Sequence, residues 1–539
     1  MKQTLPCPFK TGATARIAFI CAFFCVSLGV LAAQGETPAP GGLPAGDDKP
    51  AQAAAEADPV VYVIRDIAFD ITGRSRPFAL RYHGKLYEGE LLHGQEALDL
   101  YIKNHTQLLV NQRVLNEDVR ITYTLGETGP DGRIPVDLLV SVSDTWNIMI
   151  FPKPIWDSND GFDLTLKGRD YNFFGTMTPL RLDLGYQLNV RNESNFNFAI
   201  DTDIPFTALG LNWNIDFDNE FDYSWREALG YTNTAGVSVE LPWQRTTFVF
   251  DITHRIRWYP KNDEPDIDAG YGKYFEGLIN TVSFGVDWII PTGLNVFGLG
   301  ELSYTPRVSQ NFTYRPGDWD SFEWENSRRS VSTGLDQTLS FGQIDWIGNF
   351  RRGREVSVTN TNSYNYIMRT LDNYYILDAT GHFLFSDFFG IASRLRFRHW
   401  FNGYSQVLYH KAGDVLRGVL DNHLRANMML SLNLEFPFRI LAARPSEWFN
   451  SSAMRIFNCE IFLSPVMDFG LILLPGPINN QNALDLFCTG GMEALIFPDS
   501  MRSFYLRFSI AFNLENAVKT GELFSYGNHE FFIGLGHFF

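Results

Sequence analysis

Apolar and polar residues alternate with a period of two from Trp146 to the carboxyl terminus, in repeated segments of about ten to fifteen residues. In the clearest segment, Arg181, Asp183 and Gln187 alternate with residues that share an apolar face. That face comprises Leu180, Leu182, Leu184, Tyr186 and Leu188. A tilted strand needs about nine to eleven residues to cross hydrocarbon, and only a closed barrel pairs every backbone polar group there. The sequence therefore predicts a mainly β protein with a transmembrane antiparallel β-barrel of about 16 strands, or 18, over residues 145–539.

Two other folds agree less well with this pattern. A soluble β-sandwich also alternates, but its strands average about five or six residues. A helical membrane protein needs apolar runs of about 20 residues, and the chain has one long apolar run, Ile17 to Leu31, of about 15 residues.

The amino-terminal segment has the composition of an export signal. Lys2, Lys10 and Arg16 precede the apolar run, and the small residues Ala32 and Ala33 follow it. We expect a signal peptide over residues 1–33. Residues 34–59 are rich in Pro, Ala and Gly and lack periodicity, which predicts a disordered linker.

Residues 60–144 have a different pattern. A strand-like run opens the segment at Val60, and a helical repeat of apolar residues follows Gly94. Two strand-like runs, 119–123 and 136–140, flank a turn-forming stretch from Gly126 to Gly132. The order strand, helix, strand, strand predicts a compact α+β domain with an exposed edge strand.

Charge and cysteine content exclude several classes of function. The net charge of −17 argues against binding to a phosphate backbone, so we expect no nucleic-acid partner. After removal of the signal, Cys459 and Cys488 remain, on the outward parity of neighbouring strands, where they act as small apolar fillers. The chain has no HExxH, Walker or GxSxG motif. We therefore expect no enzyme activity, no catalytic or metal-binding residues and no cofactor.

The order of these parts resembles the BamA/TamA superfamily, the surface-antigen, barrel-assembly and two-partner-secretion proteins that place POTRA domains before a sixteen-stranded barrel. The resemblance covers about residues 60–539. It is carried by Asn172-Phe173-Phe174-Gly175-Thr176, Leu416-Arg417-Gly418-Val419, Val466-Met467-Asp468-Phe469-Gly470 and the aromatic carboxyl terminus. Five strands are predicted after Val419, as in the family. The chain departs from the family in Val419, where an aromatic residue is usual, and in having room for one POTRA-like domain, at 60–144.

The resemblance implies a loop that folds back into the barrel and is fixed there. Arg417 and Gly418 form its tip, and Asp468 and Gly470 lie on the strand that receives it. Asp468 has inward parity, so a bidentate pair with Arg417 is expected. With lumen water screening the charges, this pair should contribute about one kcal/mol. Exchanging the two charges, through Asp468→Arg with Arg417→Asp, should partly restore function that Asp468→Arg alone abolishes.

Alternating charges inside a barrel also have a plainer role, since they fill and solvate it. That interpretation also fits the charged residues predicted to face the lumen. The basic ones are Arg394, Arg396, Arg398 and Arg507, and the acidic ones are Glu435, Glu493 and Asp468.

We expect the last strand to carry a targeting signal and to form one side of the seam, the junction at which the first and last strands of the barrel meet. Phe531, Ile533, Leu535 and Phe539 share the outward parity, which resembles the carboxyl-terminal signal of barrel proteins. Gly534 and Gly536 have inward parity and should leave room for the infolded loop.

Three functions remain open from the sequence. The first is insertion or assembly of outer-membrane proteins, or polypeptide translocation, by strand capture at the POTRA edge and the barrel seam, without covalent chemistry. The second is a dedicated two-partner-type secretion pore for one exported protein, and the third is a passive porin-like channel. The first two imply unfolded outer-membrane or secreted polypeptides as partners, together with outer-membrane lipid and periplasmic chaperones or accessory lipoproteins. The expected location is the outer membrane of a diderm bacterium, with the POTRA-like domain in the periplasm.

Overall fold

The structure is a computed structural model that describes most of the chain from residue 60 onward. The residues outside the description are 1–59, 158–160, 189–193, 225–227, 260–276, 297–298, 315–329, 368, 402–409, 412–414, 420–424, 427, 475–482, 525–527 and 536–539. The predicted signal peptide and linker therefore lie outside the described residues.

The amino-terminal domain is a small mixed sheet with two helices. Its elements are β1 (Val61–Thr72), α2 (Pro77–Gly84), β2 (Leu91–His93), α3 (Gln95–Asn111), β3 (Arg120–Leu125) and β4 (Arg133–Ser143). The strand order is β2-β1-β4-β3, with β1 parallel to β4, so β3 is an edge strand. Helix α3 begins after Gly94, as predicted, and buries Leu98 and Leu109 in the core. The sequence did not predict α2 and β2, because eight and three residues are too few for a periodic signal.

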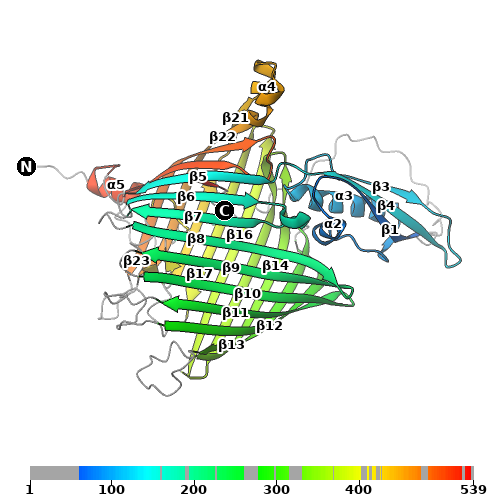
Figure 1. Cartoon of the computed structure of the whole chain (residues 1–539), viewed down its shortest axis with the longest axis horizontal. Coiled ribbons are helices and arrows are strands. Elements are labelled where there is room, and N and C mark those ends of the chain that lie inside the picture. Colours follow the sequence, from blue (N-terminus) through cyan, green and yellow to red (C-terminus); the bar gives the residue numbers. More distant parts are fainter. Residues whose placement is uncertain are drawn as a thin grey trace, which may run out of the picture.

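The rest of the chain forms a closed antiparallel barrel (Figure 1). Its first eight strands are β5 (Ile148–Asp157), β6 (Gly161–Asp170), β7 (Leu180–Leu188), β8 (Ser194–Ala208), β9 (Leu211–Ser224), β10 (Ala228–Trp243), β11 (Thr246–Tyr259) and β12 (Gly277–Asn295). The others are β13 (Glu301–Tyr314), β14 (Ser330–Ile347), β15 (Phe350–Asn365), β16 (Thr370–Ser386), β17 (Phe389–Trp400), β20 (Met428–Glu435), β21 (Phe438–Ala443), β22 (Cys459–Leu474), β23 (Ala483–Pro498), β24 (Leu506–Asn513) and β25 (His529–Leu535). The prediction of a mainly β chain, with a barrel after a small α+β domain, is confirmed.

The 19 barrel segments occupy 18 positions around the sheet, because β20 and β21 are two parts of one strand. Both parts pair with β17 and with β22, and Phe436-Pro437 interrupts them. Thirteen positions precede the long loop after β17 and five follow it. The five strands expected after the loop are present, and the two positions beyond sixteen lie before the loop.

The two faces of the barrel differ as the alternation predicts. On β7, Leu182 and Leu184 are exposed on the outer face, whereas Asp183 points inward and pairs with Lys167 at 2.8 Å and Arg169 at 2.5 Å. An apolar outer face with a polar interior is typical of barrels that span membranes. Among the described helices, none is long and apolar enough to cross a membrane.

The connections at the two ends of the barrel are unequal. We call the end that carries the amino-terminal domain the domain end and the opposite end the far end (Figure 1). Most domain-end connections are tight turns, such as the one between Trp243 and Thr246. Pro291 and Gly293 lie within β12, and the connection to β13 follows Asn295.

Two domain-end connections are longer and contain helical turns. One holds η1 (Phe173–Gly175), and the other holds α4 (Pro445–Trp448) and η3 (Ser452–Phe457). At the far end, α5 (Leu514–Thr520) links β24 to β25, and the short pair β18 (His410–Lys411) and β19 (Arg425–Ala426) flanks the long loop.

Candidate functional site

The long loop after β17 sends its tip into the barrel. Residues 415–419 are all buried, although they belong to a connection between strands. Three apolar residues of the tip, Val415, Leu416 and Val419, form a buried cluster with side chains of three strands. Those side chains are Met429 of β20, Ile472 of β22 and Phe487 of β23. The tip therefore has its own apolar core inside the lumen.

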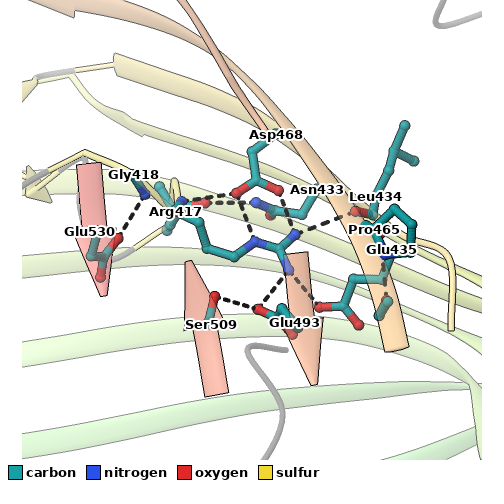
Figure 2. Close-up of polar contacts among 12 residues, drawn as sticks. Arg417, Gly418, Asn433, Leu434, Glu435, Pro465, Asp468, Glu493, Ser509 and Glu530 are labelled. Carbon is teal, nitrogen blue, oxygen red and sulfur yellow. Dashed lines mark hydrogen bonds and ion pairs between the residues drawn. The ribbon is translucent and has the colours of Figure 1, made fainter. Parts of the chain in front are cut away.

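Arg417, at the centre of the tip, is bound by carboxylates from three strands (Figure 2). Its Nη2 donates to Oδ1 of Asp468 at 2.6 Å and its Nε to Oδ2 at 3.0 Å, which is the bidentate geometry. Its Nη1 donates to Glu435 at 2.9 Å and to Glu493 at 3.1 Å. The backbone N–H of Arg417 also donates to Asp468, at 2.9 Å. The structure thus brings the predicted pair together and adds two carboxylates to it. We call Arg417, Asp468, Glu435 and Glu493 the loop lock.

The loop lock is buried, which contradicts the expected screening by lumen water. The side chain of Arg417 is 2% exposed, that of Asp468 is 1% and that of Glu435 is 5%. In a buried site, removing one partner of an ion pair costs about 3–5 kcal/mol, because the other charge stays desolvated and uncompensated. The expected screening by lumen water was therefore wrong, while the net contribution of the pair, about one kcal/mol or somewhat more, stays a prediction.

Two further contacts extend the loop lock to β24 and β25. Glu493 accepts hydrogen bonds from Nη2 of Arg507, at 2.6 Å, and from Oγ of Ser509, at 3.2 Å. Gly418 donates its backbone N–H to Oε2 of Glu530 at 2.7 Å (Figure 2). The loop tip therefore contacts the last strand of the barrel directly.

Both glycines of the predicted site are required by space. Gly418 has φ +76°, and a Cβ there would lie 2.9 Å from backbone atoms of Phe512. A Cβ on Gly470 would lie 2.4 Å from Cδ1 of Leu416. Gly418 and Gly470 thus allow the tip to approach the wall, while their predicted role in function stays a prediction.

Other predicted lumen residues have different partners. Arg394 and Arg396 pair with Asp378 on β16, at 2.6 and 2.5 Å, and lie opposite Asn433 and Ser431 of β20 in the register. Cys459 and Cys488 are free and partly buried.

The junction between the domain and the barrel is a second group of interacting residues, to which no role was assigned from the sequence. Asn172 is fully buried where the chain leaves β6. Its Nδ2 donates to Ser75 Oγ at 2.9 Å and to Asp144 Oδ2 at 3.0 Å, and its Oδ1 accepts from the N–H of Met177 at 2.9 Å. Met177 in turn packs into the core of the domain. The motif Asn172–Thr176 therefore clamps the domain onto the barrel, and we call it the clamp.

Helix α2 rests on the same clamp. Arg76 donates its backbone N–H to the carbonyl of Gly175 at 3.0 Å, and the ring of His83 bonds the carbonyl of Thr176 at 3.0 Å. Burial lowers the pKa of His83 below its ordinary value of 6.5, so the ring is neutral at pH 7 and donates one N–H to this carbonyl.

Arg113 anchors the other side of the domain. Its guanidinium donates to the carbonyl of Gly348 at 3.1 Å and to Asn349 at 2.7 Å, both in the β14–β15 turn, and it bonds the carbonyl of Arg502. It also lies 4.1 Å from the ring centre of Trp346. Burial lowers the pKa of Arg113 to about 9. The domain is therefore attached to turns on separate parts of the barrel rim.

The last strand places its side chains as the parity predicts where they are described. Phe531 and Ile533 are exposed on the outer face, while Glu530 points to the loop. The side chain of Leu535 and all of Phe539 lie outside the described residues. The expected role of Gly534 was wrong, because the place of its missing Cβ is filled by the ring of Phe532, at 2.3 Å, and not by the loop.

The seam lies between β25 and β5. On the edge of β5 that pairs with β6, the carbonyl of Asn147 accepts the N–H of Tyr171 at 2.8 Å. These two residues are the next pair in the ladder before Ile148 and Asp170. Hydrogen-bonded and non-bonded pairs alternate in an antiparallel ladder, so the even-numbered residues of β5 direct their backbone groups toward the seam. Pro152 and Pro154 are both even-numbered and have no N–H. The seam edge of β5 therefore lacks two donors.

Comparisons with known proteins give structural similarity. No family model matches the chain, and no curated protein matches it. Among solved structures, the chain is similar to CdiB from Acinetobacter baumannii, with 13% identity, a TM-score of 0.45 and coverage of 84% of this chain and 70% of that one. It is similar to BamA from Haemophilus ducreyi lacking POTRA domains 1–3, with 13% identity, a TM-score of 0.34 and coverage of 88% and 85%. It is also similar to CdiB from Escherichia coli, with 8% identity, a TM-score of 0.38 and coverage of 86% and 88%.

Proposed function

We propose that this protein inserts or translocates polypeptides at the outer membrane of a diderm bacterium by exchanging backbone hydrogen bonds, without covalent chemistry. The amino-terminal domain then lies in the periplasm, and the domain end of the barrel faces it. The apolar outer face of the strands supports the membrane location.

The observation that carries the proposal is the seam edge of β5. An unpaired or poorly paired strand edge is a template for adding another strand. Pro152 and Pro154 remove two hydrogen-bond donors from the seam. The first and last strands therefore lose few backbone hydrogen bonds when they separate. An incoming strand with its own donors and acceptors can then pair with either edge.

The amino-terminal domain offers a second edge for the same kind of pairing. Strand β3 ends the four-stranded sheet, and Arg120, Thr122 and Thr124 are exposed on it. An extended polypeptide can add to this edge through main-chain hydrogen bonds. Since the clamp fixes the domain to the barrel, a captured segment is held close to the domain end.

The loop lock supports a barrel that is closed at rest. A passive porin needs a constitutively open lumen, whereas here a buried loop tip fills part of it. A dedicated secretion pore for one exported protein shares these features, so it remains the second candidate.

Restoring donors to the seam tests the mechanism. In the variant Pro152→Val with Pro154→Val, two new N–H groups face β25, so the seam should separate less readily. We expect a higher melting temperature of the folded barrel and reduced complementation of a strain depleted of the protein. Pro306→Val, on β13 and far from the seam in strand order, is the matched control and should leave complementation unchanged. Full complementation by the double variant would count against exchange at the seam.

A further inference from the structure

The connection from β21 to β22 projects from the barrel wall. It comprises residues 444–458, with α4 and η3, and it extends beyond the neighbouring strand ends (Figure 1). We call it the finger. Its helical turns fit the sequence, since Pro445 starts α4 and Asn450, at φ +46°, ends the turn that follows.

One side of the finger is apolar and open. The exposed fractions are 60% for Trp448, 69% for Phe449, 57% for Ile456 and 60% for Phe457, and Met454 is exposed beside them. A group of large apolar side chains of this kind marks an interaction surface, because water is a poor solvent for it.

The other side of the finger is polar and is tied to the barrel. Asn458 donates from Nδ2 to Ser446 Oγ at 2.8 Å and accepts the N–H of Ser446 at 3.1 Å. Arg444 pairs with Asp499, in the β23–β24 turn, at 3.2 Å. A hollow between the finger and this turn is lined by polar residues. They are Ser446, Glu447, Asn450, Ser451, Ser452, Arg455, Asn458, Asp499 and Ser500. None of the exposed apolar residues named above lines this hollow, so the polar side of the finger faces the β23–β24 turn and the apolar residues lie away from it.

The apolar side continues the outer face of the barrel. Ile440 and Leu441, on the strand that leads into the finger, are 58% and 45% exposed on that face. Trp and Phe at the end of a membrane-spanning strand are typical of the boundary between headgroups and acyl chains. An element with one apolar and one polar side lies in this boundary with its apolar side buried.

We propose that the finger is a lipid-binding element whose apolar side inserts into the membrane leaflet at the domain end of the barrel. This inference rests on the proposed placement of the barrel in a membrane and not on the activity toward polypeptides. The finger lies on the seam side of the barrel. The β23–β24 turn that pairs with Arg444 also accepts, at Ser500, the N–H of Trp146 that leads into β5, at 3.0 Å. The finger therefore meets lipid next to the entrance of the first strand.

Site-specific fluorescence in lipid vesicles tests the proposal. The chain without residues 1–33, which hold the other three cysteines, carries Cys459→Ala and Cys488→Ala. One new cysteine is introduced at a time and labelled with an environment-sensitive dye. Phe449→Cys reports the apolar side of the finger, and Ser452→Cys, which is exposed on the polar side, is the matched control. Val308→Cys, in the middle of β13 and 53% exposed, reports whether the barrel itself is inserted. Vesicles of phosphatidylethanolamine and phosphatidylglycerol contain brominated acyl chains, and iodide is the aqueous quencher.

Brominated lipid should quench the fluorescence of the dye several-fold more strongly at position 449 than at position 452. Iodide should quench it more strongly at position 452 than at position 449. Quenching by lipid at 308 but not at 449 would overturn the lipid-binding finger while leaving the barrel in the membrane; the apolar side would then be a protein-binding surface. Quenching by lipid at neither 308 nor 449 would overturn the membrane placement itself.

Discussion

Replacing Arg417 with methionine should release the loop tip from the lumen and raise the conductance of the barrel. The variant leaves Asp468 and Glu435 buried without the guanidinium that compensates them, while Glu493 keeps its ion pair with Arg507. Loss of one partner from a buried ion pair costs about 3–5 kcal/mol. Since 1.4 kcal/mol is a factor of ten, the ratio of closed to open loop should fall by about two to four orders of magnitude. Single-channel recording in planar bilayers measures this change directly.

The matched control for this variant is Arg307→Met. Arg307 also pairs with two lumen carboxylates, Asp251 at 2.8 Å and Asp287 at 2.6 Å, but it lies on β13 and holds no loop. Its side chain is 31% exposed, so water can compensate its partners. The conductance of this control should stay close to that of the unchanged protein. Equal conductance of Arg417→Met and the unchanged protein would show that the loop tip is held by other contacts.

The geometry also changes the expected outcome of charge exchange. A carboxylate at position 417 would face Glu435 and Glu493 as well as the arginine introduced at 468. Because like charges repel strongly in a buried site, Asp468→Arg with Arg417→Asp should not restore the closed state.

Replacing Asn172 with leucine should undock the amino-terminal domain from the barrel. The substitution removes the acceptor for Met177 N–H and the donor to Ser75 and Asp144, in a position with no access to water. Each buried polar group left without a partner costs about 1–3 kcal/mol. We expect faster amide hydrogen exchange in α2 and at 172–178, with the barrel strands still protected.

Asn197→Leu provides the comparison for this prediction. Asn197 lies on β8 and donates to Asp222 at 2.8 Å, away from the junction. It should leave exchange in α2 unchanged. If Asn172→Leu also leaves α2 as protected as before, the clamp does not hold the domain.

The barrel was predictable because its signal is repeated in every strand. Leu182 and Leu184 on one face and Asp183 on the other follow from parity alone, whatever the neighbouring strands are. The amino-terminal domain was predicted less completely, because α2 and β2 are too short to show a period.

The candidate site was predictable only in part. Arg417 and Asp468 were paired by family resemblance and parity, but Glu435 and Glu493 come from other strands and were indistinguishable from carboxylates that solvate a lumen. Burial of the pair depends on all of these strands at once, so the local sequence predicted an exposed pair. The clamp was visible as a motif at Asn172–Thr176, yet its partners Ser75 and Asp144 lie far away in the sequence.

The finger was not predicted because its sequence lacks a regular period. The residues before β22 form η3, at Ser452–Phe457, and β22 itself starts at Cys459. Two short helical turns separated by a residue with positive φ, Asn450, give no pattern that distinguishes them from a strand start.

The most direct test of the proposed function is depletion of this protein from its own cells, followed by a quantitative proteome of the outer membrane and of the secreted fraction. We expect polypeptides to disappear from one of these fractions: many barrel proteins if the role is assembly, or one exported protein if the role is dedicated secretion. Unchanged proteomes together with reduced solute uptake would contradict it and would identify the barrel as a passive channel.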